Sequence, residues 1–589
     1  MKRLSLLFFL CVLLCHQAVS YAEEVDLGRA TQVAETFFGS GKTTKGASSD
    51  IVLKWTGNMV QTKAGSTPAF YVFENIAGGF VVVSGDDCVQ PVLGYSYEGK
   101  FSYENMPSNV EAWFSGLEGG IRYMRESGAV SDALISEKWN ELSSGSYEMK
   151  NEMSPVLLET AEWNQTEPFN RLTSEYGSQY TGCGATAMSI ILRYFRYPER
   201  GHGQVGGYSY ETAGGQTVYV DSYQLGKTYD WDNMPLSYQT YTEEQAEAVS
   251  QLMFECALSL ESMFDTDGTG TYDNMYAPAL IDHMSYDAGI VSYDREIFSQ
   301  SRWLEMLYSN IRDTGPVWYS GQGDGGGHTF VVDGYDSEGN LHINWGWGGY
   351  DNGYYAFPDF GDYPYSHTAV FGIKPDEGGE APEVVGLKEA FDNNGLAFTD
   401  PDIEVEVNVP FEVKYGFVYN AGTTTFNGSI AVVSVDRMEQ IKEFLAEDLQ
   451  NISLEPGYGY YGVVSRCTIT EDIEIGDKIK LYYRSNRGGD WMPVLFGTDF
   501  GVTGELYLTD PYFIREVTSF EYLPEENLIR IETLADLDWT FSSSYGGEVA
   551  GGNTFDDGII EIDTTDLPSG EYTVRISSDK DSFALDVVL

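Results

Sequence analysis

The chain has 589 residues, too many for a single hydrophobic core, and its length predicts roughly three to four domains. It carries 34 Lys and Arg against 90 Asp and Glu, a formal net charge of −56. This charge repels nucleic acid and anionic membrane surfaces, so we expect neither as a partner. With 42 Tyr, 31 Phe, 11 Trp and 65 Gly, the composition is typical of an aromatic-rich globular protein with much β-structure.

The first residues predict export from the cell. Residues 1–22 combine the basic pair Lys2-Arg3 with an apolar run from Leu4 to Leu14 and small residues at the end, which is typical of a secretory signal peptide. The run is too short to cross a bilayer, and no later segment is apolar for long enough, so we expect no membrane span. The predicted location is therefore outside the cell or on its surface.

The cysteines are few and widely spaced. The sequence has six, and two of them, Cys11 and Cys15, lie in the predicted signal peptide. The others are Cys88, Cys183, Cys256 and Cys467. Their spacing fits neither a disulfide framework nor a zinc site, so we expect no metal and no cofactor. An unpaired thiol in an exported protein then raises the question of what it does.

The N-terminal part of the mature chain, residues 23–150, predicts a self-contained α/β unit. Residues 69–73 and 79–83 are typical of paired strands, and apolar residues at helical spacing predict a helix over 110–121. The stretch 127–151 mixes Ser, Gly, Glu and Lys with few large apolar residues. We expect it to be an exposed connector that proteases can cut.

Residues 151–374 form an aromatic-rich block that contains the candidate nucleophile. Apolar residues at helical spacing predict a helix from Cys183 to Phe195, ended by Tyr197-Pro198. A thiol at a helix N-terminus faces the positive end of the helix dipole and free amide N–H groups, which favour the thiolate and lower its pKa. From this stretch alone a buried apolar role for Cys183 is equally consistent. Cys256 lies on the apolar face of a second predicted helix and is expected to be a core residue.

A thiolate nucleophile needs a base, and the base needs an orienting partner. His328 follows three glycines and opens the predicted strand 329–333, a position from which its side chain can reach a cleft. The predicted return strand ends at Asn344, whose side chain can fix the tautomer of an imidazole. His342 shares a strand face with Asn344 and is the rival base, although a histidine inside a strand is more often packed in the core.

The separations 328 − 183 = 145 and 344 − 328 = 16 match the Cys, His, Asn order of papain-like enzymes. The full strings are Trp163-Asn164-Gln165, Gly182-Cys183-Gly184-Ala185-Thr186, Gly327-His328-Thr329-Phe330-Val331 and His342-Ile343-Asn344-Trp345-Gly346-Trp347. Together they resemble the streptopain family of secreted bacterial cysteine peptidases. Residues 80–96 resemble the inhibitory propeptide of that family.

The resemblance implies an α+β fold: a papain-like catalytic domain with a helical half and an antiparallel β half, preceded by an α/β propeptide that inhibits the enzyme of its own chain. It implies a zymogen of a cysteine endopeptidase that acts on proteins or peptides. It makes Cys183 the nucleophile, His328 the base and Asn344 its orienting partner, with Gln165 donating to the oxyanion.

The same resemblance assigns three residues to the substrate side of the site. Trp345 is expected to shield Asn344 from water and to contact substrate. Gly327 and Gly182, which flank the base and the nucleophile, are expected to line the substrate cleft.

Beyond residue 374 the sequence predicts two β-sandwich-like modules without a histidine. A linker at 375–383 is followed by alternating apolar and polar residues over 384–510 and again over 511–589. Residues 566–576 resemble the end of the C-terminal sorting domains of exported Bacteroidetes proteins. Two alternatives to the endopeptidase stay open at this stage, a thiol amidase or transpeptidase and an inactive peptidase-like binding protein of the cell surface.

Overall fold

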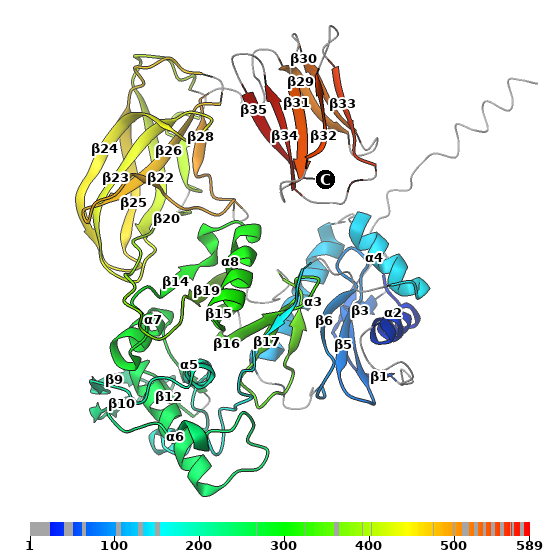
Figure 1. The fold of residues 1–589 in the computed structure, drawn as a ribbon, viewed down its shortest axis with the longest axis vertical. Helices are drawn as coiled ribbons and strands as arrows, with labels where there is room; N and C mark the ends of the chain where they lie inside the picture. Colours follow the sequence, from blue (N-terminus) through cyan, green and yellow to red (C-terminus); the bar gives the residue numbers. More distant parts are fainter. Residues whose placement is uncertain are drawn as a thin grey trace, which may run out of the picture. The chain divides into compact units, whose positions relative to one another are not determined.

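The protein is described here from a computed structural model. The residues it describes are 24–40, 51–61, 66–101, 106, 108–127, 133–147, 153–266, 268–323, 326–357, 365–390, 393–401, 403–474, 476–498, 501–508, 517–523, 528–533, 538–543, 548–553, 559–565, 567, 571–577 and 582–588. The predicted signal peptide lies outside them, as does part of the stretch that resembles a sorting domain. Two compact units result, one formed by the chain up to 295 with 300–381 and the other by 296–299 with the chain from 382 (Figure 1).

The first unit is built on one eleven-stranded sheet that runs through both the N-terminal part and the catalytic block. In spatial order its strands are β1 (Ile51–Thr56), β4 (Phe70–Asn75), β5 (Phe80–Ser84), β6 (Val92–Ser96), β18 (Gly353–Tyr355), β17 (Leu341–Asn344), β16 (Gly326–Tyr335), β15 (Val317–Gly323), β19 (Tyr365–Phe371) and β14 (Val291–Asp294), with β7 (Val156–Leu157) against β16. All of these pairs are antiparallel. The join is the pairing of β6 with β18, so the two parts share a single sheet.

The N-terminal part packs three helices with its strands. These are α2 (Leu27–Ser40), α3 (Ser108–Ser127) and α4 (Ala133–Ser144), and a short hairpin of β2 (Met59–Gln61) and β3 (Ser66–Pro68) accompanies them. The predicted strand pair is confirmed as β4 and β5, and the predicted helix over 110–121 is confirmed as the middle of α3. The apolar sides of α2 and α4 meet β4, β5 and β6 in one core.

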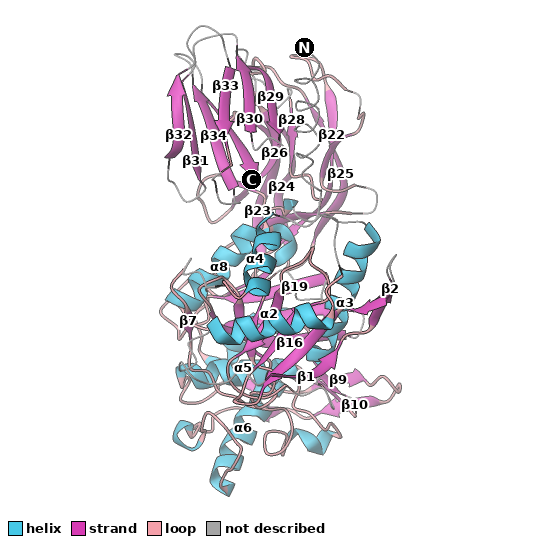
Figure 2. Ribbon diagram, turned by 90° about the vertical axis from the view of Figure 1, so that its right-hand side faces the viewer, coloured by secondary structure: helices cyan, strands magenta, loops and turns pink. Residues whose placement is uncertain are grey.

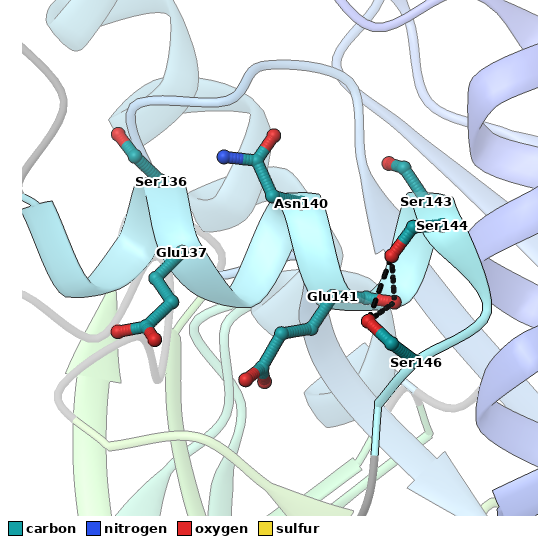
Figure 3. A pocket seen from close by; sticks show the side chains of 7 residues that line it. All are labelled: Ser136, Glu137, Asn140, Glu141, Ser143, Ser144 and Ser146. Atoms are coloured by element: carbon teal, nitrogen blue, oxygen red, sulfur yellow. Dashed lines mark hydrogen bonds between the residues drawn. The ribbon is translucent and has the colours of Figure 1, made fainter.

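The expectation of an exposed connector over 127–151 was wrong for its middle. Residues 133–144 are helix α4, with Trp139 and Leu142 fully buried and the Trp139 indole donating to the Val89 carbonyl at 2.8 Å. The polar residues that suggested a connector occupy the other side of the helix. Figure 3 shows these polar residues around an open pocket: Ser136, Glu137, Asn140, Glu141, Ser143 and Ser144 of α4, and Ser146 just after it. Residues 128–132 and 148–151 of the predicted connector lie outside the described residues.

The helical half of the catalytic block packs around the buried helix that begins at Cys183. Its helices are α5 (Cys183–Phe195), α6 (Glu243–Ser259), α7 (Tyr276–Pro278) and α8 (Gln300–Asp313). Three two-stranded sheets lie between the described helices. These are β8 (Gln204–Val205) with β11 (Tyr223–Gln224), the hairpin of β9 (Tyr208–Glu211) and β10 (Thr217–Val220) between those two strands, and the hairpin of β12 (Met263–Asp265) and β13 (Gly268–Gly270). Thr242 and Gln245 form a capping box at the start of α6, and α6 packs its buried Cys256 in the same core as α5, as predicted.

The second unit consists of strands throughout the described residues (Figure 2). A first sandwich pairs β20 (Val385–Lys388), β21 (Leu396–Phe398), β22 (Phe411–Asn420) and β25 (Gly459–Cys467) in one sheet and β23 (Phe426–Val435), β24 (Ile441–Leu454), β26 (Lys478–Ser485), β27 (Met492–Pro493) and β28 (Glu505–Tyr507) in the other. A second comprises β29 (Val517–Leu523), β30 (Leu528–Thr533) and β33 (Ile559–Asp563), and β31 (Asp538–Ser543), β32 (Glu548–Asn553), β34 (Glu571–Ser577) and β35 (Ser582–Val588). Both predicted β-sandwich-like modules are thus confirmed.

Within the part of the chain that the structure describes, no helix combines the length and apolar character needed to cross a membrane.

Candidate active site

Cys183 is the first residue of α5, and the backbone on either side of it packs closely against other residues. Gly182 precedes it with φ = 99°, a backbone conformation that residues with a side chain rarely adopt. A Cβ on Gly182 would lie 2.9 Å from the side chain of Thr269, and one on Gly184 would lie 2.6 Å from that of Thr271. The two glycines therefore let the helix start, and its thiol, sit against the β12–β13 hairpin and the residue that follows it.

The thiol does not carry the lowered pKa that the sequence predicted. Burial raises the pKa of Cys183 above its ordinary value and outweighs the hydrogen bonds from Thr329, Gly184 and its own backbone, which lower it. In this conformation the loss of hydration thus destabilises the thiolate more than the start of the helix stabilises it. The other thiols are no competitors, because burial raises the pKa of Cys256 to about 12 and that of Cys467 to about 12.

His328 lies in β16, two residues from its start, and faces inward. It is 6% exposed, and burial lowers the pKa of its imidazole to about 3, against a smaller opposing effect of the Trp345 backbone. Its Nε2 is buried and has no hydrogen-bond partner among the described residues. The imidazole is therefore neutral at physiological pH, with one nitrogen free to accept a proton once the ring can meet a donor.

Asn344 ends β17 as predicted, but other partners hold its amide group. Its Nδ2 donates to Thr160 Oγ1 at 3.1 Å and to the Ala161 carbonyl at 3.0 Å, and its Oδ1 accepts from the Gly346 N–H at 3.2 Å. In this conformation the side chain ties β17 to the segment after β7. Its role as the orienting partner of His328 stays a prediction.

The rival histidine is engaged in a different contact. Nδ1 of His342 lies 2.5 Å from Asp333 Oδ1, and its ring packs edge-on against Tyr354 at 4.9 Å between centroids. The other oxygen of Asp333 accepts from the Thr160 hydroxyl. Asp333 and the Tyr354 ring thus hold His342 in place. This favours a structural role for His342 over that of a mobile base.

The remaining predicted residues lie around this arrangement. Gln165 is 4% exposed, and its carbonyl accepts the N–H of Thr181 at 2.9 Å, which places it beside the entry to α5. Trp345 is 1% exposed and packs on Phe330 at 4.9 Å, so it contributes to the core in this conformation. Gly327 is exposed near the tip of the β15–β16 hairpin.

The N-terminal part makes hydrogen bonds and an ion pair with the turn between β16 and β17, the strands that carry His328 and Asn344. In that turn Asp336 accepts from the Tyr95 hydroxyl at 2.7 Å. Glu338 accepts from the Tyr147 hydroxyl at 2.5 Å and pairs with Lys138 Nζ at 2.7 Å. The contacts supplement the β6–β18 pairing, in which Tyr95 lies opposite Tyr354. The N-terminal part is therefore bound to the hairpin that positions the base.

Comparisons with known proteins agree with this arrangement of an inhibitor and an enzyme. Residues 163–355 match the model of the peptidase C10 family, and residues 22–121 match that of the Spi protease inhibitor. Residues 163–355 thus have the sequence features of a peptidase C10 catalytic domain. The predicted resemblance to streptopains and to their propeptide is thereby confirmed.

Among C10 relatives, the thiol protease/hemagglutinin PrtT of Porphyromonas gingivalis is 28% identical over 529 residues, which cover 83% of this chain and 57% of PrtT. Streptopain of Streptococcus pyogenes is 27% identical over 336 residues, which cover 52% of this chain and 80% of streptopain. A solved fragment of Prevotella intermedia prointerpain A shares 27% identity with a TM-score of 0.41 and covers 54% of this chain and 99% of that one. The chain thus spans little more than half the length of PrtT.

The buried neutral imidazole predicts an acid-sensitive C10 zymogen. Since the pKa of His328 is about 3 in the folded chain and roughly 6.5 when unfolded, the unfolded chain binds one more proton between these values, and stability falls as pH falls through this window. We expect a Cys183→Ala chain, which cannot process itself, to have a lower melting temperature for its first transition at pH 4 than at pH 6.5. Adding His328→Gln should make this difference smaller.

The control for this measurement is His202→Gln, because His202 is exposed. It should leave the pH dependence as it is in the Cys183→Ala parent. An equal acid sensitivity with and without the His328 imidazole would contradict the buried neutral state.

Proposed function

We propose that the chain is an exported cysteine endopeptidase made as a zymogen, which hydrolyses peptide bonds of proteins through a covalent thioester. The observation that carries the proposal is the strand pairing of an inhibitor-type domain with a C10 catalytic domain, reinforced by contacts to the hairpin of His328 and Asn344. The similarity to the thiol protease PrtT and to streptopain supports it.

The proposed reaction starts at the N-terminus of α5. The Cys183 thiolate attacks the peptide carbonyl, and the backbone N–H of Cys183 and the Gln165 amide donate to the oxyanion. Imidazolium His328 protonates the leaving amine, and water then hydrolyses the thioester with His328 as the base. Asn344 would hold the imidazole tautomer, and Trp345 would cover that bond.

The neutral thiol and the neutral imidazole of the intact chain are not yet the reactive ion pair. Formation of that pair requires the His328 ring to reach the thiol and take its proton. We infer that release of the N-terminal part frees the β16–β17 hairpin to make this adjustment. Proteins are the proposed substrates, and residues 1–22 support export as the route to them.

The proposal predicts casein hydrolysis that depends on the two catalytic side chains. Cys183→Ala and His328→Ala should each lower kcat/KM by about 10⁴-fold or more, since nucleophile and base act as a unit. Cys467→Ala, which removes a buried thiol of the second unit, is the matched control and should retain activity. A folded Cys183→Ala protein with undiminished hydrolysis would refute the proposal, and activity confined to small amides would favour the amidase alternative.

The strand pairing predicts a variant that matures too easily. A Cβ on Gly94 would lie 2.7 Å from the Tyr355 ring and 3.3 Å from Trp113, so Gly94→Val should push β6 away from β18. We expect the precursor to shorten several-fold faster on a time course followed by gel electrophoresis.

Gly120→Ala is the matched control, because a Cβ there meets nothing within 4 Å and Ala suits the helix α3. Lys138→Met removes the ion pair with Glu338 without a new side chain between the strands and should also speed processing. If both Gly94→Val and Lys138→Met process at the parent rate, the pairing does not restrain the enzyme.

A further inference from the structure

The side-chain amide of Asn344 has one orientation that satisfies its surroundings. One end lies 3.0 Å from the Ala161 carbonyl, which can only accept, and the other lies 3.2 Å from the N–H of Gly346, which can only donate. The end that faces Ala161 is therefore Nδ2, and the end that faces Gly346 is Oδ1. Asn344 is fully buried, where an unpaired amide group would destabilise the fold.

Thr160 takes the second proton of this Nδ2. Thr160 Oγ1 lies 3.1 Å from Asn344 Nδ2, and the Thr160 hydroxyl donates to Oδ2 of Asp333. A hydroxyl has a single proton, so a Thr160 oxygen that gives its proton to a carboxylate can only accept from Asn344. Both N–H groups of Nδ2 are then used. With these described partners, the hydrogen-bonding position left on Asn344 is the second lone pair of Oδ1, an acceptor for an imidazole N–H.

A bulge in β16 places the carboxylate of Asp333 in this arrangement. β16 and β17 pair Val332 with Ile343 and Gly334 with His342, so Asp333 is an extra residue with no opposite residue on β17. Such a bulge re-aims the side chain that it carries. The Asp333 side chain is 2% exposed, and its Oδ1 accepts from Nδ1 of His342 at 2.5 Å. Each carboxylate oxygen of Asp333 thus receives one donor, which fixes the direction of both hydrogen bonds.

The segment after β7 brings Thr160 to this carboxylate. β7 pairs with β16, and the Leu158 N–H then donates to the Asp333 carbonyl at 2.9 Å. A Cβ on Gly334 would lie 2.6 Å from the Val156 carbonyl, so this close approach requires glycine. The backbone that carries Thr160 is therefore anchored along β16 before the hydroxyl meets the carboxylate.

We infer that Thr160 and Asp333 are positioning residues for Asn344: the Asp333 carboxylate directs the Thr160 hydroxyl, and the hydroxyl holds the Asn344 amide with its oxygen ready to accept from the imidazole. The inference rests on the proposed function, in which Asn344 holds the tautomer of His328. Neither Thr160 nor Asp333 is expected to touch the reacting peptide bond. The amide is oriented in the intact chain, before the His328 ring meets it, and such preorganisation favours a productive geometry.

The test is a double-mutant cycle between positions 160 and 344, measured as kcat and KM for casein hydrolysis. Chains that do not process themselves are cut by immobilised parent enzyme, which is then removed. Thr160→Val keeps the side-chain shape without the hydroxyl and should lower kcat about tenfold with KM little changed, because the orientation of Asn344 is lost. In Asn344→Ala the same substitution should have no further effect. Thr160→Ser restores the hydroxyl and should keep kcat near that of the parent.

Thr424→Val is the matched control. It removes a buried hydroxyl of the second unit that has no hydrogen-bond partner among the described residues, and it should leave kcat and KM unchanged. If the Thr160→Val chain does not fold, Thr160→Ala serves the same cycle. A loss of kcat that is equally large in the parent and in Asn344→Ala would overturn the inference, because position 160 would then act by loosening the fold and not through Asn344.

The same cycle in the urea unfolding of the Cys183→Ala precursor tests the hydrogen bonds without peptidase activity. Thr160→Val should lower the midpoint of the first transition more in this precursor than in one that also carries Asn344→Ala, since residues that share a hydrogen bond are coupled. Equal shifts in both would overturn the inference. Unequal shifts in a protein whose parent chain does not hydrolyse casein would support the hydrogen-bonded unit and refute the proposed function alone.

Discussion

The hydrogen bonding of β6 to β18 is the interaction on which the arrangement of the first unit depends. It makes the inhibitor-type domain and the β half of the catalytic domain one sheet, with Gly94 opposite Tyr355 because a larger residue would not fit. The same register brings the Tyr95 hydroxyl to Asp336, in the turn between β16 and β17. Strand pairing and turn contacts thus act on one hairpin, the one that carries the proposed base and its orienting partner.

Burial is the dominant electrostatic effect at the site and gives it a neutral state. It raises the pKa of the Cys183 thiol and lowers that of the His328 imidazole to about 3, so neither side chain is charged near pH 7. A reactive thiolate and imidazolium would stabilise each other only when adjacent. In this state neither side chain carries the charge that the proposed reaction requires, which agrees with the proposal of a precursor that is not yet active.

Local patterns in the sequence predicted the elements but not their long-range contacts. Helical spacing predicted α5 and α6, and short apolar runs bounded by turn residues predicted β4, β5 and the strands of His328 and Asn344. The polar residues of α4 suggested an exposed connector although its Trp139 is buried, because composition does not reveal which face of a helix packs against the core. The β6–β18 join and the hydrogen bond of Thr160 with Asn344 link residues far apart in the chain, and no spacing rule connects them. The prediction of a lowered thiol pKa was wrong for the same reason, since burial depends on tertiary packing.

We propose that residues 24–147 restrain the enzyme and must leave before it acts. N-terminal sequencing of the species that hydrolyses casein, isolated from the processed full chain, tests it most directly. We expect an active form that begins within residues 145–155, after α4, and therefore lacks β6. A fully active form that still begins near residue 24 would contradict it, because β6 and β18 would then remain paired in the working enzyme.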